Sequence, residues 1–100
     1  MTANLTESDA VALAATGLES LAAALAGHGF DTRISRGGGT LSLSVINRGA
    51  PDCNENIAAS RAGDGTWWFW WSWGDRLACI GDIERAAFKI AYVLSPQAGD

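Results

Sequence analysis

The sequence predicts a two-layer α+β domain of the order αββββα, in which both helices cover one face of an antiparallel four-stranded sheet. Two stretches with apolar residues at helical spacing lie near the ends of the chain, and four stretches read as strands lie between them. All five tryptophans fall in the run WWFWWSW at 67–73, whose rings a small fold must largely bury. The length of 100 residues suits one hydrophobic core, so we expect a single domain over residues 1–100.

The helices are predicted from apolar residues that recur on one side at the helical period. The first is expected over residues 7–26, with the stripe Val11, Ala14, Ala15, Leu18, Leu21, Ala22 and Leu25. The second is expected over residues 83–94, capped by Asp82 and ended by Pro96. Its core stripe is Ile83, Ala86, Ala87, Ile90, Val93 and Leu94.

The strands are predicted from alternation and from glycine-rich turns. Residues 30–36 and 40–47 form a hairpin around the glycines at 37–39, and Leu41, Leu43 and Val45 alternate with polar residues. A weaker strand over 56–62 leads through a second glycine-containing turn into the tryptophan strand, 66–73.

Alternation along the tryptophan strand divides its side chains between the two faces of the sheet. Ser72 would lie on the same side as Trp68 and Trp70, which matches the polar face of the other strands. We therefore expect Trp67, Phe69, Trp71 and Trp73 beneath the helices. The candidate binding face on the opposite side comprises Trp68, Trp70, Ser42, Ser44, Ser60 and Arg33.

Composition narrows the classes of partner. A net charge of −4, with seven scattered basic residues, argues against nucleic acid, because phosphate backbones are bound by clustered Lys and Arg. No stretch reaches the roughly 18 apolar residues of a membrane span, and the N-terminus lacks the pattern of a signal peptide. We expect a cytoplasmic protein without membrane association, in which Cys53 and Cys79 are free thiols.

The tryptophan face admits three interpretations. Its rings are half covered by the small residues of their own sheet, or they contact a protein partner or a second copy, or they form a platform for a small ligand or carbohydrate. Phe88 and Tyr92, four residues apart on the second helix, are a secondary candidate contact unless a terminal segment or loop covers them.

The sequence singles out no catalytic, cofactor-binding or metal-binding residues. His28 is the only histidine, and nothing in the pattern supplies it with a nucleophile and an orienting carboxylate. We therefore expect a non-enzymatic interaction or accessory module without a cofactor, with binding of a small ligand as the alternative.

The segment WWFWWSWGD at 67–75, followed by Leu77, Gly81, Asp82 and the helix ending Tyr92-Val93-Leu94, resembles a group of short actinobacterial proteins of uncharacterised function. The resemblance implies a cytoplasmic accessory role and brings no catalytic residues. At the level of fold, the predicted helix, sheet and helix are similar to small secretion-chaperone-like domains, which bind other proteins and often dimerise. The chain lacks additional strands and helices that some of those domains carry.

Overall fold

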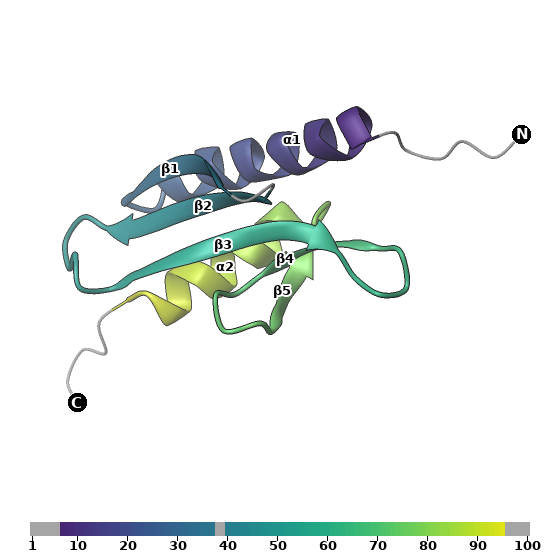
Figure 1. Cartoon of the computed structure of the whole chain (residues 1–100). Helices are drawn as coiled ribbons and strands as arrows, with labels where there is room; N and C mark the ends of the chain where they lie inside the picture. Colours follow the sequence, from purple (N-terminus) through teal and green to yellow (C-terminus); the bar gives the residue numbers. More distant parts are fainter. Residues whose placement is uncertain (1–6, 38–39, 96–100) are drawn as a thin grey trace, which may run out of the picture.

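The computed structural model describes residues 7–37 and 40–95, with side chains described over 12–36 and 41–95. Figure 1 shows the elements, which follow in the order α1 (Glu7–Ala26), β1 (Phe30–Gly37), β2 (Thr40–Asn47), β3 (Asn54–Arg61), β4 (Trp67–Trp70), β5 (Arg76–Cys79) and α2 (Ile83–Val93). The predicted α+β class is confirmed. Both helices and the first three strands lie within two residues of their predicted bounds.

The sheet has five strands rather than the predicted four, and each strand pairs antiparallel with its neighbour in sequence. The expected strand 66–73 ends at Trp70, where the chain reverses into β5. The Trp71 N–H donates to the Asp75 carbonyl at 2.9 Å, and the Gly74 N–H donates to the Trp71 carbonyl at 3.0 Å. Gly74 has a φ of 96°, a conformation that favours glycine. The last three residues of WWFWWSW therefore belong to a turn.

A carboxylate from β3 holds this turn in place. The Ser72 backbone N–H donates to Glu55 Oε2 at 2.9 Å, and the Ser72 hydroxyl donates to the same oxygen at 2.8 Å. Ser72 is thus a turn residue and not, as predicted, a strand residue beside Trp70.

The turn also changes where the tryptophans lie. Phe69 and Trp71 are buried as predicted, whereas Trp67 is half-buried against the core. Trp73, predicted beneath the helices, is 56% exposed. Its ring stacks on Trp71 at a centroid distance of 4.7 Å, and its Nε1–H donates to Asp75 at 2.9 Å. The prediction for Trp73 is wrong because strand alternation stops before this residue.

The core lies between one face of the sheet and the two helices. The strand pairing places Leu43 opposite Ile57, Ala59 opposite Phe69, and Phe69 opposite Ala78, so these buried residues share a face. The same cluster includes residues from α1 and α2, among them Leu18, Leu21, Leu25, Ala86, Ala87 and Ile90. Both helices therefore lie over this face, as Figure 1 shows, and they also contact each other.

A glycine in the middle of α1 lets this helix approach the far edge of the sheet. A Cβ atom at Gly17 would lie 2.6 Å from Ile80 Cγ1 and 3.6 Å from the end of the Phe69 ring. Both distances are measured to side chains of the core layer, and the first is too short for any real contact. A larger residue at position 17 would therefore require Ile80 to shift, although glycine is a poor helix former.

The second helix begins as the sequence predicts, since the Asp82 carboxylate accepts a hydrogen bond from the Arg85 backbone N–H at 3.3 Å. Val93, placed on the core stripe, is instead 46% exposed. Successive helical residues are about 100° apart, so Val93 falls at the margin of the stripe that Leu94 completes. The predicted Val11 contact, the Pro96 stop and the turn at Gly38 and Gly39 lie outside the described side chains and residues.

Candidate functional site

The strand register brings the predicted binding residues to the outer face of the sheet, away from the helices. Ser42 and Ser44 lie on β2, and Ser60 lies on β3 opposite Trp68. Trp70 lies opposite Ala58, which is itself paired with Ser42. The three serines and both tryptophans are half-buried.

Arg33 shares this face but is remote from the tryptophans. It lies on edge strand β1, opposite Ser44 of β2 and three strands from β4. Because neighbouring strands are about 4.8 Å apart, the spacing across the sheet is about 14 Å. Arg33 and Ser44 instead line a shallow groove of about 310 Å³ with Asp31, Thr32 and Ile46. The candidate face therefore divides into a tryptophan part and an arginine part.

The cation beside the tryptophans is Arg76, which the sequence interpretation missed. Its guanidinium carbon lies 4.8 Å from the Trp68 ring centroid and 5.8 Å from the Trp70 ring centroid. These distances are typical of cation–π contacts. Arg76 opens β5 opposite Trp70, so only recognition of the turn at Trp71 to Asp75 reveals it.

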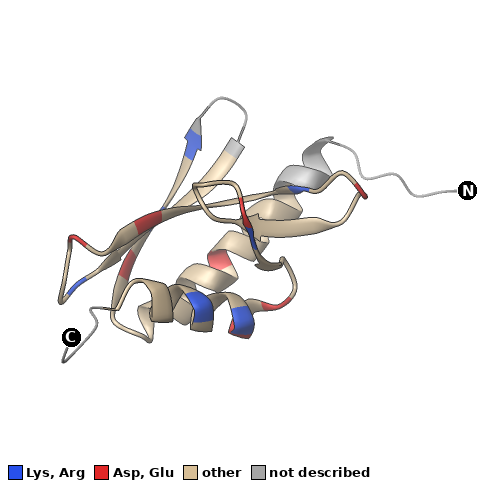
Figure 2. Ribbon diagram, turned by 90° about the horizontal axis from the view of Figure 1, so that it is seen from below, with Lys and Arg blue, Asp and Glu red and all other residues tan. Residues whose placement is uncertain are grey.

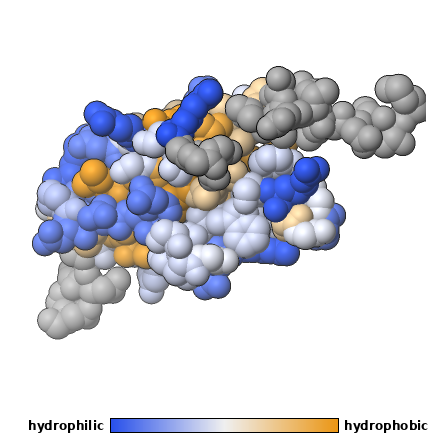
Figure 3. Space-filling view, in the orientation of Figure 1, coloured by the Kyte–Doolittle hydropathy of each residue, from blue (hydrophilic) through white to orange (hydrophobic). Residues whose placement is uncertain are grey.

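Both indole N–H groups on this face have acceptors within the molecule. Trp68 donates to the Thr66 hydroxyl at 2.7 Å, and Trp70 donates to the Ser60 carbonyl at 3.2 Å. The first interpretation of the tryptophan face, rings half covered by their own sheet, thus agrees with these contacts. Figure 3, viewed as in Figure 1, shows a surface that is mostly hydrophilic or neutral with small hydrophobic areas.

The most exposed aromatic side chains lie instead on α2. Phe88 is 71% exposed and Tyr92 is 68% exposed, and the exposed Val93 adjoins them in sequence. Within the described residues, no terminal segment or loop covers the two rings. The secondary candidate of the sequence therefore presents more bare aromatic surface than the primary one.

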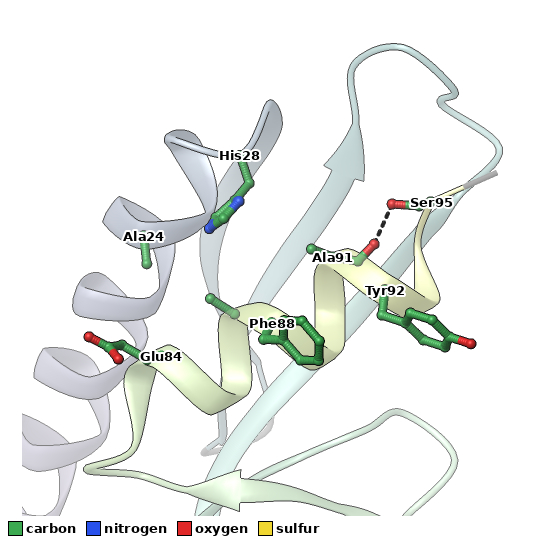
Figure 4. A pocket seen from close by; sticks show the side chains of 8 residues that line it. Ala24, His28, Glu84, Phe88, Ala91, Tyr92 and Ser95 are labelled. Carbon is green, nitrogen blue, oxygen red and sulfur yellow. Dashed lines mark hydrogen bonds between the residues drawn. The ribbon is translucent and has the colours of Figure 1, made fainter. Parts of the chain in front are cut away.

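Phe88 and Tyr92 border an open groove of about 600 Å³ between the C-terminal half of α1 and α2. Figure 4 shows Ala24 and His28 on the α1 side and the two rings projecting from α2. The full lining is Ala24, His28, Glu84, Ala87, Phe88, Ala91, Tyr92 and Ser95. Most of it is apolar, and small side chains form its floor.

The groups that could support chemistry are dispersed. His28 lines the groove between the helices, whereas the exposed thiol Cys79 lies in a different groove beside β5. In residues 7–37 and 40–95, no three His, Cys, Asp or Glu side chains are placed to hold a metal ion. Figure 2 shows acidic and basic residues distributed over the fold. In the same described part of the chain, neither helix combines the length and apolar character needed to cross a membrane.

Neither protein-family models, nor curated proteins, nor solved structures match the chain.

Proposed function

We propose that the protein is a non-catalytic, cytoplasmic interaction module that self-associates through the outer face of α2. The observation that carries the proposal is the exposure of Phe88 and Tyr92, 71% and 68%, at neighbouring positions on one helix. Contiguous apolar surface of this kind on a small protein marks an interaction site, and aromatic residues contribute most to such contacts.

The shape of this face fits a second copy of the chain. Protruding rings and a hollow floored by Ala24, Ala87 and Ala91 lie side by side on one surface. A two-fold axis places the rings of each copy in the groove of the other, which is an isologous contact. With the two α2 helices antiparallel, Phe88 of one copy faces Tyr92 of the other.

The available surface is compatible with a small dimer interface. Fully buried aromatic side chains contribute about 150–250 Å² each, so the exposed parts of the two rings supply roughly 200–350 Å² per copy. A standard interface buries about 800 Å² per partner, and the groove walls and Val93 supply further apolar area. Among the described residues, Glu84 is the one acidic residue that lines the groove, and no Lys or Arg lines it, so few charges would be buried in the contact.

Sedimentation velocity over a wide concentration range tests this proposal. We expect the wild type to dimerise and the double variant Phe88→Ser/Tyr92→Ser to remain monomeric. Trp73→Ser is the matched control, because it removes an exposed aromatic ring from the β4–β5 turn and should leave the dimer intact. A wild-type protein that stays monomeric at its highest soluble concentration contradicts self-association.

The alternative function is binding of a small ligand or carbohydrate on the outer sheet face. It is favoured by one arrangement, the two indoles of Trp68 and Trp70 beside a common guanidinium from Arg76. Indole rings stack on planar or CH-rich ligands, and the half-buried Ser42 and Ser60 add hydroxyl groups nearby. Tryptophan emission that stays unchanged across a panel of sugars and metabolites argues against this function.

A further inference from the structure

A third groove, of about 430 Å³, follows the outer edge of β5 and the side of α2 that faces it. Its volume lies within the range of small-molecule sites, about 300–1,000 Å³. Its lining combines an indole, buried apolar residues and three charged side chains: Trp68, Leu77, Ala78, Cys79, Asp82, Arg85 and Lys89.

Backbone acceptors along this edge are already occupied. The Leu77 carbonyl accepts from Lys89 Nζ at 3.0 Å, and the Cys79 carbonyl accepts from the Asp82 N–H at 2.9 Å. Both carbonyls therefore face away from β4. An incoming strand needs acceptors as well as donors, so this edge is protected against strand addition.

At least one backbone donor remains on the same edge. Ile80 donates to the Trp67 carbonyl at 3.2 Å, and Ala78 pairs with Phe69, so residues 78 and 80 direct their backbone groups toward β4. The alternation of an antiparallel ladder then directs the Cys79 N–H outward, beside its occupied carbonyl. The open edge thus presents a donor to an acceptor group.

The charged side chains of the groove add to this preference. Asp82 is engaged by Arg85, through the backbone N–H at 3.3 Å and Nε at 3.1 Å. Lys89 is half-buried and uses one of its three donors on Leu77, which leaves two for a ligand. Two cations and one paired acid give the groove a local charge of about +1, although the whole chain carries −4.

The apolar part of the groove is preformed. The groove follows the edge of β5, where Leu77 and Ala78 are buried, and the Trp68 ring borders it from the outer face of the sheet. The Trp68 hydrogen bond to Thr66 and the Arg76 guanidinium 4.8 Å from its centroid hold this ring in place. A flat apolar group is the shape that such a ring accommodates.

We propose that this groove binds a small aromatic carboxylate. The carboxylate receives hydrogen bonds from Lys89 Nζ and the Cys79 N–H, with Arg85 contributing charge, and the aromatic ring lies against Trp68. None of the described residues that line this groove lines the groove beside Phe88 and Tyr92, so the proposal does not rest on the proposed self-association.

Titration of the whole protein with 2-naphthoate, followed by amide NMR shifts and calorimetry, tests this site. We expect saturable binding, with the Cys79 amide among the groups that shift. The neutral analogue 2-naphthamide should bind about tenfold or more weakly, because it carries no negative charge to pair with the cations of Lys89 and Arg85. Acetate should also bind more weakly, because it lacks the ring.

Variants separate the groove from the remaining surface. Lys89→Met keeps the apolar stem and should weaken 2-naphthoate binding about tenfold or more, whereas Lys89→Arg should retain most of it. Arg33→Met is the matched control, since it removes an exposed cation from another groove. Equal binding of acid and amide by the wild type, unchanged binding by Lys89→Met, or the absence of saturable binding overturns the proposal.

Discussion

The outer sheet face and the outer face of α2 each carry two aromatic residues, but the rings differ in how much of their surface is exposed. Trp68 and Trp70 lie on the sheet, where strand neighbours and Arg76 partly cover each ring and each indole N–H has an acceptor within the molecule. Phe88 and Tyr92 project from a helix and remain about 70% exposed. The size of an aromatic ring therefore does not predict how exposed it is. In this protein, exposure depends on whether the ring lies on a strand or a helix and on whether a cation covers it.

The largest expected effect comes from comparing a buried phenylalanine with an exposed one. Phe69→Ala should lower the free energy of unfolding by about 3–5 kcal/mol, because Phe69 is fully buried and truncation leaves a cavity. Phe88→Ala should change it by less than about 0.5 kcal/mol in the monomer. Urea denaturation at low protein concentration measures both values. Similar losses for the two variants would mean that α2 is covered in solution.

A second comparison concerns the depth at which α1 sits on the sheet. Gly17→Ala should destabilise the fold by about 1–3 kcal/mol, because the new methyl group overlaps Ile80, despite the better helix propensity of alanine. Gly27→Ala is the matched control, since its nearest neighbour lies 3.5 Å from the added atom. Thermal unfolding of both variants should separate them, and a stabilised Gly17→Ala protein would contradict the tight contact.

A smaller loss of stability is expected from removing the Arg76 guanidinium, which contacts both Trp68 and Trp70. Arg76→Met should cost about 1 kcal/mol, because two cation–π contacts on a partly exposed face are lost. It should also increase acrylamide quenching of tryptophan emission, since both rings become more accessible. Arg33→Met removes a cation on the same sheet face that lies far from the indoles. Equal quenching of the two variants would show that Arg76 does not cover them.

The smallest expected effect is a pH dependence in the β3–β4 turn. Hydrogen bonds from the Thr66 hydroxyl and backbone N–H lower the pKa of the exposed Asp64 carboxyl. The ionised form is thus favoured in the folded state. Its contribution to stability is present at neutral pH and is lost as the pH falls below about 3.9 toward the lowered pKa.

Denaturation of the wild type and Asp64→Asn at neutral and acid pH isolates this contribution. The variant should lose less stability on acidification than the wild type. Identical pH dependence of the two proteins would show that the Thr66 contacts do not favour the ionised carboxyl.

The helices and the first three strands could be predicted because each has a regular pattern and a clear stop. The β4–β5 hairpin could not, since the aromatic run continues through Trp71 and Trp73 and conceals a four-residue strand beyond Gly74. Because this turn was not predicted, Ser72 and Trp73 were assigned to the strand, and Arg76 was not recognised as a neighbour of the tryptophans. A turn-forming Gly-Asp pair followed by the apolar run LACI at 77–80 was the available signal.

The sequence was sufficient to predict which residues share the outer sheet face. It was not sufficient to predict how far apart they lie or how exposed they are. Alternation correctly placed Trp68 and Trp70 on one face with Ser42, Ser44 and Ser60. Strand order, which separates Arg33 from the indoles, depends on tertiary pairing. The grooves beside α2 require the angle and depth at which the helices cross the sheet. No single element of the sequence encodes that arrangement.

The succession of strands along the sheet has a consequence for how the chain folds. Every strand pairing joins neighbours in sequence, whereas the contact of α1 with α2 closes a loop of more than fifty residues. Nucleation by successive hairpins incurs little loop-closure entropy, and helix closure comes late. Substitutions of residues at the packing contact of α1 with α2 should therefore accelerate unfolding and leave the refolding rate nearly unchanged.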